Sequence, residues 1–178
     1  MKFSERPLAV VDLETSGLDA GIHEILDLAV LVVDQRTLKL RERYSARVRP
    51  QNIRRGAKRA LEVVGYSPRE WRTAVPLEAA MEIFSEKTSG AVLCSANMYL
   101  TRSFLDAAFK ACGVEDLTSY HHVDLMSLAW ARAGDIGMDR LTMDALARRL
   151  GIPSEPAPRR AANGARLALA VLKALSGR

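Results

Sequence analysis

The chain has 178 residues, of which 48% are hydrophobic and 26% charged. This composition is typical of a globular protein and excludes a disordered or fibrous chain, and the length fits one domain spanning residues 1–178. No apolar run approaches the roughly 18 residues that cross a bilayer, and the first residues lack the apolar stretch of a secretory signal. We therefore expect a cytoplasmic protein with no membrane partner.

The net charge is +5, and arginine supplies 20 of the 26 basic residues. A basic, arginine-rich chain favours an anionic partner such as nucleic acid, although genomic base composition alone also produces Ala- and Arg-rich chains. Cys94 and Cys112 lie among apolar neighbours, which predicts buried, reduced thiols. Together with the three histidines they show no zinc-type spacing.

The first predicted strand, in the sequence LAVVDLETSGLD (residues 8–19), ends in two acids. Alternate residues of a strand point to the same face, so Asp12 and Glu14 are expected side by side. Like charges held together are unfavourable unless a cation lies between them, and the pair therefore predicts a cation site. The other interpretation is that one carboxylate accepts backbone hydrogen bonds in the following turn.

Two further strands complete a predicted meander. Residues 23–34 are long and apolar enough to cross a sheet, and residues 38–50 alternate between basic and other side chains. Short turns between these segments favour antiparallel pairing. The alternation predicts a basic side of the third strand, formed by Arg41, Arg43, Ser45, Arg47 and Arg49.

Helices and strands then alternate. Residues 52–65 predict a short basic helix, and residues 76–90 an amphipathic helix with proline at its start and glycine after its end. A buried strand is expected at residues 91–97, and a helix at residues 101–113. The basic side chains gathered on the first of these helices are Arg54, Arg55, Lys58 and Arg59.

Residues 121–134 begin as a short strand and continue as a helix, and two more helices are predicted at residues 141–152 and 159–175. Three strands followed by strands that alternate with helices indicate an α/β fold. We expect a mixed five-stranded sheet with helices on both faces.

Three segments resemble, in order, the motifs of the DEDDh 3'–5' exonuclease family, which includes the proofreading exonuclease subunits of DNA polymerases. VVDLETSGLD resembles the first motif, CSANMYLTRSFLDAAF the second and RRAANGARLALAVL the third, so that the resemblance covers nearly the whole chain. It implies a ribonuclease-H-like fold, two Mg²⁺ or Mn²⁺ ions held by four acids, and a histidine that takes a proton from the attacking water.

Asp12 and Glu14 match two of the four acids, and the resemblance therefore implies that they are catalytic and hold the metal. The turn after them would meet a 3'-terminal nucleotide, and the start of the second motif would line the same site. By the same resemblance, the candidate substrate-binding residues are Thr15, Gly17, Leu18, Asn97, Leu100 and Arg159.

Three positions depart from the family pattern: Thr101 stands at the third acid, Gly164 at the fourth, and Arg159 at the histidine. Shifting the third motif by one residue would put Pro158 and Asn163 at the last two places, and neither alignment restores a base or an acid. A guanidinium group stays protonated at ordinary pH, so Arg159 cannot act as a base. It would oppose a second cation nearby, and it would suit a phosphate.

Three other parts of the sequence offer polar side chains that could replace the missing ligands. Asp106 lies five residues after Thr101, about 140° around a helix from it, and Asn163 offers only a neutral oxygen to a hard cation. The histidines of YHHVD, which precede Asp124, are adjacent in a strand and so point to opposite faces. None of these residues is expected to complete a metal site.

Three functions remain open. The first is an exonuclease-fold protein that acts on or binds nucleic acid, at 3' ends or single strands, with impaired or lost 3'–5' exonuclease activity. The second is a weak exonuclease that uses Asp12, Glu14 and one Mg²⁺ or Mn²⁺ ion. The third is a scaffold for a protein partner, with no cofactor. Base stacking would need aromatic side chains, for which Tyr99 and Trp71 are the candidates, although both suit a core or rim position.

Overall fold

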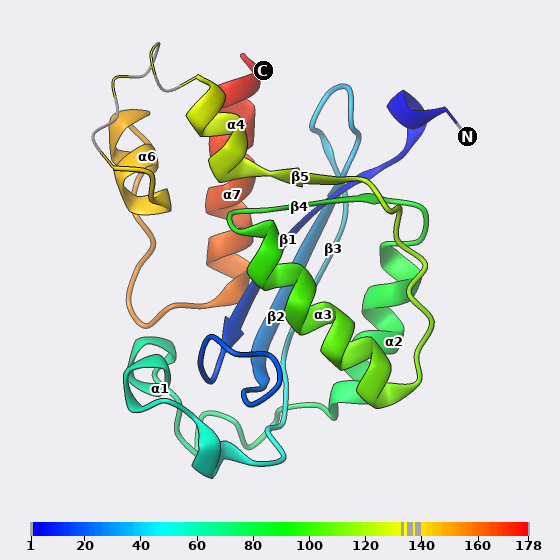
Figure 1. Ribbon diagram of the computed structural model, residues 1–178, viewed down its shortest axis with the longest axis vertical. Coiled ribbons are helices and arrows are strands. Elements are labelled where there is room, and N and C mark those ends of the chain that lie inside the picture. Colours follow the sequence, from blue (N-terminus) through cyan, green and yellow to red (C-terminus); the bar gives the residue numbers. More distant parts are fainter. Residues whose placement is uncertain (1, 133, 135–136, 138–139, 178) are drawn as a thin grey trace.

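The computed structural model describes residues 2–132, 134, 137 and 140–177. One five-stranded sheet, in the order β3-β2-β1-β4-β5, forms its centre (Figure 1). The first three strands pair antiparallel, whereas β4 and β5 run parallel to β1. The strands are β1 (Leu8–Thr15), β2 (Ile25–Val33), β3 (Leu40–Arg47), β4 (Val92–Ser95) and β5 (His122–Asp124). The predicted mixed sheet is confirmed.

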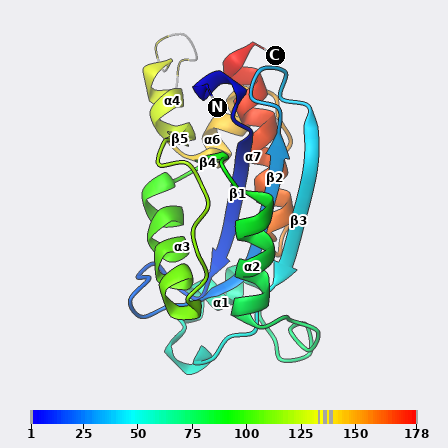
Figure 2. The ribbon, with the colours of Figure 1, turned by 90° about the vertical axis from the view of Figure 1, so that its right-hand side faces the viewer.

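Helices cover both faces of the sheet, also as predicted. Residues of α2 and α3 join the core on one face, and residues of α7, α4 and α6 form the core on the other. Figure 2 shows α2 in front of the sheet and α7 behind it. The helices are α1 (Lys58–Val64), α2 (Leu77–Lys87), α3 (Met98–Cys112), α4 (Leu125–Ala131), α6 (Met143–Arg149) and α7 (Ala161–Ser176), with 3₁₀ turns η1 (Phe3–Glu5) and η2 (Ile53–Arg55).

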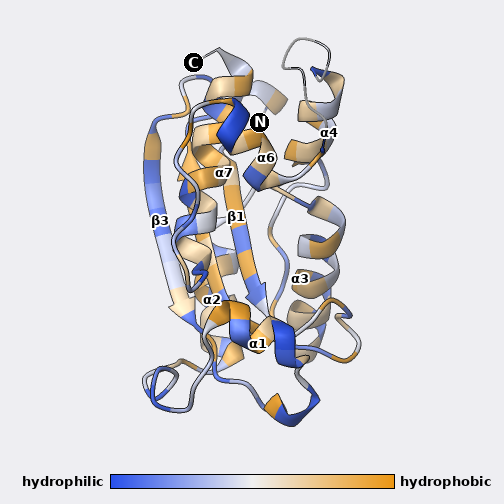
Figure 3. Cartoon of the chain, turned by 90° about the vertical axis from the view of Figure 1, so that its left-hand side faces the viewer, coloured by the Kyte–Doolittle hydropathy of each residue, from blue (hydrophilic) through white to orange (hydrophobic). Residues whose placement is uncertain are grey.

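The hydrophobicity of each strand matches the extent to which helices cover it. All nine residues of β2 are buried, because its two faces pack against different helices, and a continuous apolar run satisfies both. The first four residues of β3, at the sheet edge, are all exposed. Figure 3 shows the corresponding contrast between an apolar β1 and a polar β3. Both cysteines are free, Cys94 being buried.

Two element predictions were wrong in detail. The helix expected at residues 52–65 is interrupted, because Gly56 and Ala57 adopt extended backbone between η2 and α1. The helix expected from residue 101 begins at Met98, since the Asn97 side chain accepts a hydrogen bond from the Leu100 N–H and caps it. The predicted helix end near residue 134 falls partly outside the described residues. None of the helices in the described ranges is long and apolar enough to span a membrane.

Candidate active-site cleft

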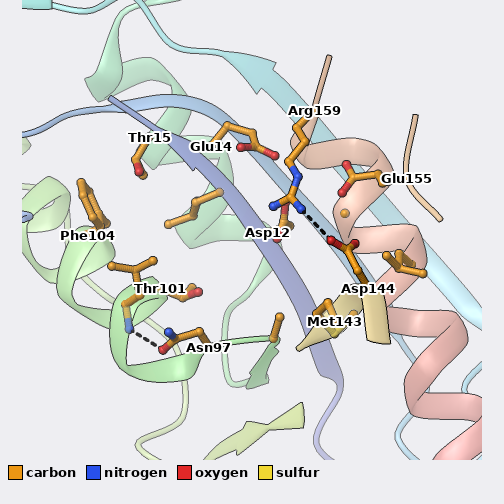
Figure 4. A pocket seen from close by; sticks show the side chains of 15 residues that line it. Asp12, Glu14, Thr15, Asn97, Thr101, Phe104, Met143, Asp144, Glu155 and Arg159 are labelled. Carbon is orange, nitrogen blue, oxygen red and sulfur yellow. Dashed lines mark hydrogen bonds and ion pairs between the residues drawn. The ribbon is translucent and has the colours of Figure 1, made fainter. Parts of the chain in front are cut away.

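A cleft lies at the carboxyl end of β1, between α3 on one side and α6 and the start of α7 on the other (Figure 4). All three segments that resemble exonuclease motifs contribute to it. Its lining residues are Asp12, Leu13, Glu14, Thr15, Ala96, Asn97, Leu100, Thr101, Phe104, Met143, Asp144, Glu155, Arg159, Gly164 and Leu167.

Strand β1 brings Asp12 and Glu14 onto one face. In the antiparallel register, Asp12 lies opposite Ala29 and Glu14 opposite Asp27, on the side of the sheet that α7 covers. Asp27 is itself only 5% exposed, and its Oδ2 accepts a hydrogen bond from the Ala161 N–H at 3.3 Å. Sequence reasoning missed Asp27, which sits inside the apolar run of β2.

The positions of the two absent acids face Asp12 and Glu14. Thr101 is buried on α3 and lines the cleft. Gly164 lies in the first turns of α7, where an added Cβ would be 2.2 Å from Asp12 Oδ2. Because position 164 faces Asp12, the structure supports the alignment in which Gly164, rather than Asn163, stands at the position of the fourth acid. Asn163 is not among the lining residues, and its Oδ1 accepts from Arg166.

Arg159 is the only Lys, Arg or His among the described residues that line the cleft. Figure 4 shows its guanidinium between the carboxylates of β1 and those of Asp144 and Glu155. Its Nη2 lies 3.4 Å from Asp144 Oδ2. Neither of these two acids was singled out from the sequence. Asp144 lies in α6 and Glu155 in the loop before α7, and only the fold, which makes both line the cleft, reveals them.

Three acids of the cleft, Asp12, Glu14 and Glu155, lie in surroundings that make their ionised forms unfavourable. Burial, and then repulsion from Glu155, raises the pKa of Glu14 to about 7, while Arg159 opposes the shift. Burial and the charges of Glu14 and Glu155 raise the pKa of Asp12 well above its usual value. Burial also raises the pKa of Glu155. One arginine therefore compensates the cluster incompletely.

The donor set does not fit the pair of metal ions that the family pattern implies. Two ions carry four positive charges, and two of the four matching acids are replaced by Thr101 and Gly164. Within the described ranges, no three His, Cys, Asp or Glu side chains are grouped closely enough to hold one ion. In the structure, the carboxylates of Asp12 and Glu14 share the cleft with the guanidinium of Arg159.

Two predicted substrate-binding residues lie outside the cleft lining. Leu18 is 79% exposed, and Gly17 is buried against the ring of His23, where an added Cβ would lie 2.4 Å from that ring. Thr15 lines the cleft, and its Oγ1 donates to Gly17 O at 2.6 Å. Asn97 and Leu100 also line it, from the start of α3. Their roles stay predictions.

The rejected ligands lie elsewhere. Asp106 pairs with Arg102 on the exposed side of α3, away from the cleft. Asp124 caps α4 and accepts from the Met98 N–H at 2.8 Å. The ring of His121 packs against Phe3. His122 is exposed at the start of β5.

The two aromatic residues predicted as candidates for base stacking lie in different environments. Tyr99 is 86% exposed, whereas Trp71 is buried and donates from Nε1 to Leu26 O at 2.9 Å. The guanidinium carbons of Arg47 and Arg160 lie 5.0 and 5.5 Å from the centre of the Trp71 ring. Trp71 is therefore a core residue in contact with two cations, and it is too buried for a base to stack on it.

The comparisons with known proteins agree with this geometry. The family model described as Exonuclease (RNase_T) matches residues 9–172. The chain belongs to this exonuclease family. No curated protein matches it significantly in sequence.

The fold is similar to that of part of exonuclease I. One solved exonuclease I structure matches with a TM-score of 0.83, and E. coli exonuclease I bound to a dT13 oligonucleotide with 0.80; both are 15% identical over 97% of this chain. An ExoI/SSB-Ct complex matches with a TM-score of 0.81, also at 15% identity, over 98% of this chain. The chain spans 41 to 42% of the length of these proteins. The ribonuclease-H-like fold implied by the motifs is confirmed.

Substituting Gly164 by alanine should destabilise the protein, because the new Cβ would force the Asp12 carboxylate to move. We expect the free energy of unfolding in urea to fall by roughly 1–3 kcal/mol. In an Asp12→Ala background the clashing oxygens are gone, and the same substitution should cost clearly less. An equal cost in both backgrounds would contradict the contact.

Asp27→Asn should make the protein more stable at neutral pH. Burial raises the pKa of Asp27 to about 6 in the folded state, so folding disfavours its charged form. Stability is then lost as pH rises from the unfolded pKa near 4 to about 6, by about 2–3 kcal/mol. The variant should show a smaller decline over this window in pH-dependent urea unfolding.

Asp34→Asn is the matched control, for which the expected change in stability at neutral pH has the opposite sign. Hydrogen bonds from Thr37 and Arg41 lower the pKa of Asp34 to about 2, so its ionised form is favoured by folding. Its contribution is present above the unfolded pKa and lost below it. Asp34→Asn should therefore lower stability at neutral pH, and equal effects of the two variants would refute the burial argument.

Proposed function

We propose that the protein binds single-stranded nucleic acid or its 3' end at this cleft, and that its 3'–5' exonuclease activity is impaired or lost. One observation carries the proposal. The cleft of an exonuclease fold keeps Asp12 and Glu14, but presents Thr101, Gly164 and Arg159 where the family resemblance expects two acids and a histidine.

The chemistry explains why these changes matter. Hydrolysis of a phosphodiester needs a base for the attacking water, and loss of such a base costs roughly 10² to 10⁴ in rate. Arg159 cannot accept that proton. Weakened metal binding removes the stabilisation of the attacking and leaving oxygens as well, a separate loss.

A basic surface lies beside the cleft. Turn η2 and helix α1 pack at the end of β1, where the Ala57 N–H donates to Ser16 O at 2.7 Å. Arg54, Arg55 and Arg59 are exposed there. The predicted basic side of β3 offers less, because Arg41 pairs with Asp34 and Arg47 with Glu70. Exonuclease I has been solved with dT13 and dA16 oligonucleotides, which supports a single-stranded ligand here.

Two other functions have support. The retained Asp12 and Glu14 favour a weak exonuclease that uses a single Mg²⁺ or Mn²⁺ ion. The ExoI/SSB-Ct complex favours a role in holding a protein partner. The two free cysteines suit our expectation of a cytoplasmic location.

Binding of a fluorescent oligothymidine, measured by anisotropy in EDTA, should weaken steeply with added salt. Arg54→Ala/Arg59→Ala should weaken it further and flatten the slope of log K against log salt by about 1.4, since each lost phosphate contact removes about 0.7. The control variant Lys39→Ala/Lys110→Ala removes the same charge from other exposed positions. Equal effects of the two variants would locate binding elsewhere, and salt-independent binding or none would favour the scaffold.

Shortening of a 5'-labelled oligothymidine in Mg²⁺ or Mn²⁺ should be at least about 10²-fold slower than with exonuclease I, because the base is missing. Gel electrophoresis would resolve the products, and any residual rate should disappear in Asp12→Ala. A rate equal to that of exonuclease I, abolished by Asp12→Ala, would overturn the loss of activity.

A further inference from the structure

A second groove lies between α7 and β3, at the edge of the sheet. Helix α7 packs mainly on β1 and β2, and β3 extends beyond it, so that the outer part of this face stays open. Figure 2 shows β3 at that outer edge. The volume of the groove is about 730 Å³, within the range of roughly 300–1,000 Å³ that is typical of ligand sites. We call this groove, which includes Leu31 of β2, Arg43 of β3 and Leu169 of α7, the edge groove.

The apolar part of the edge groove is aliphatic and partly open to water. Leu31 and Leu169 are almost fully buried, whereas Leu40, at the start of β3, is 51% exposed. Ala29 of β2 and Ala162 of α7 are too small to fill the space beside them. An apolar side chain of a ligand would remove Leu40 from water, which is favourable.

The charged part of the edge groove is basic. Arg43 lies opposite Leu31 in the register of β3 with β2, and it therefore belongs to the face that α7 covers. Arg166 and Lys173 come from α7 and lie two helical turns apart, about 10 Å. Arg43 and Lys173 take part in none of the ion pairs found among the described residues. Arg166 donates to the neutral Oδ1 of Asn163 at 2.8 Å.

Acidic side chains are absent from the described lining of the edge groove, and helix α7 contains none between Ala161 and Ser176. The one acid of β3, Glu42, lies opposite Val32 on the other face of the sheet. There it pairs with Lys87 of α2 at 2.8 Å. The three cations of the edge groove are therefore left for an anionic partner.

A peptide fits the edge groove better than a nucleic acid does. Stacking of bases requires an exposed aromatic ring. Tyr44 is the one aromatic residue among the described residues that line the groove, and it packs against the core on the other face, opposite Val30. Aliphatic side chains beside cations instead suit a polypeptide that carries carboxylates next to apolar side chains.

We infer that the edge groove binds a protein partner through an acidic segment that contains large apolar side chains. The apolar side chains lie against Leu40 and Leu169, and the flanking carboxylates pair with the three cations. An extended chain rises about 3.3 Å per residue, so that a segment of three or four residues spans the distance between Arg166 and Lys173. The inference does not rest on the proposed function, because no described residue lines both the edge groove and the cleft.

Fluorescence anisotropy with the labelled synthetic peptide EDELLDED tests this inference. The protein should bind it about tenfold or more tightly than EDESSDED, which has the same charge but lacks the apolar side chains. Leu40→Ser should weaken binding of EDELLDED about threefold or more and leave binding of EDESSDED unchanged. Arg43→Glu/Arg166→Glu should weaken it about tenfold or more, because the attraction becomes repulsion. The control Arg72→Glu/Lys110→Glu makes the same change in charge at exposed positions outside the groove and should bind like wild type.

Absence of binding, equal affinity for the two peptides, or equal effects of the two double variants would overturn the inference. A larger loss of oligothymidine than of peptide binding in Arg43→Glu/Arg166→Glu would assign the groove to nucleic acid. Conversion of a dimer to a monomer by this variant, in sedimentation velocity, would assign it to a second copy of the chain. Circular dichroism checks folding, and Arg43→Gln/Lys173→Gln replaces the charge reversal if that variant unfolds. Failure of the wild type to bind oligothymidine would contradict the proposed function alone.

Discussion

Compensation of negative charge in a buried cleft is the constraint on which this site depends. Strand alternation puts Asp12 and Glu14 on one face, and α7 then closes over that face. Desolvation makes the charged forms of both acids unfavourable, which requires a proton, a metal ion or a basic side chain nearby. Among the described lining residues, Arg159 alone meets that need from within the chain. The geometry around Arg159 therefore decides what the cleft can do.

Several distant segments converge to place that arginine. Asp27 of β2 accepts the Ala161 N–H and so fixes the first turn of α7 against the sheet. The Val63 carbonyl at the end of α1 accepts the Arg159 N–H, and the Arg160 guanidinium lies over Trp71. These contacts join α1, β2 and α7 at one point. The orientation of Arg159 is thus a property of the tertiary fold rather than of its own helix, which begins two residues later.

Sequence reasoning located the elements whose signals are local. Apolar runs identified β1, β2 and β4, and the alternation after Val11 placed Asp12 and Glu14 side by side. What it missed was non-local. Glu155 and Asp144 become part of the cleft only when the fold brings α6 and the loop before α7 to the end of β1, and no sequence pattern around them marks this. The basic side of β3 was overestimated in part for the same reason, since Glu70, the partner of Arg47, comes from a distant segment, whereas Asp34, the partner of Arg41, lies in the preceding turn.

The net charge of +5 also needs a second interpretation, because the cleft itself is acidic. A phosphodiester that approached four carboxylates and one arginine would be repelled unless something neutralised them. Under the proposed function, attraction of nucleic acid would then come from outside the cleft, where Arg54, Arg55 and Arg59 are exposed on η2 and α1. In this arrangement, the basic side chains that would attract nucleic acid at long range differ from the cleft side chains that would contact its end. In the proposed function, a strand held at η2 and α1 would present its end to the cleft, and Arg159 would pair with the terminal phosphate only by leaving the acids that it now neutralises.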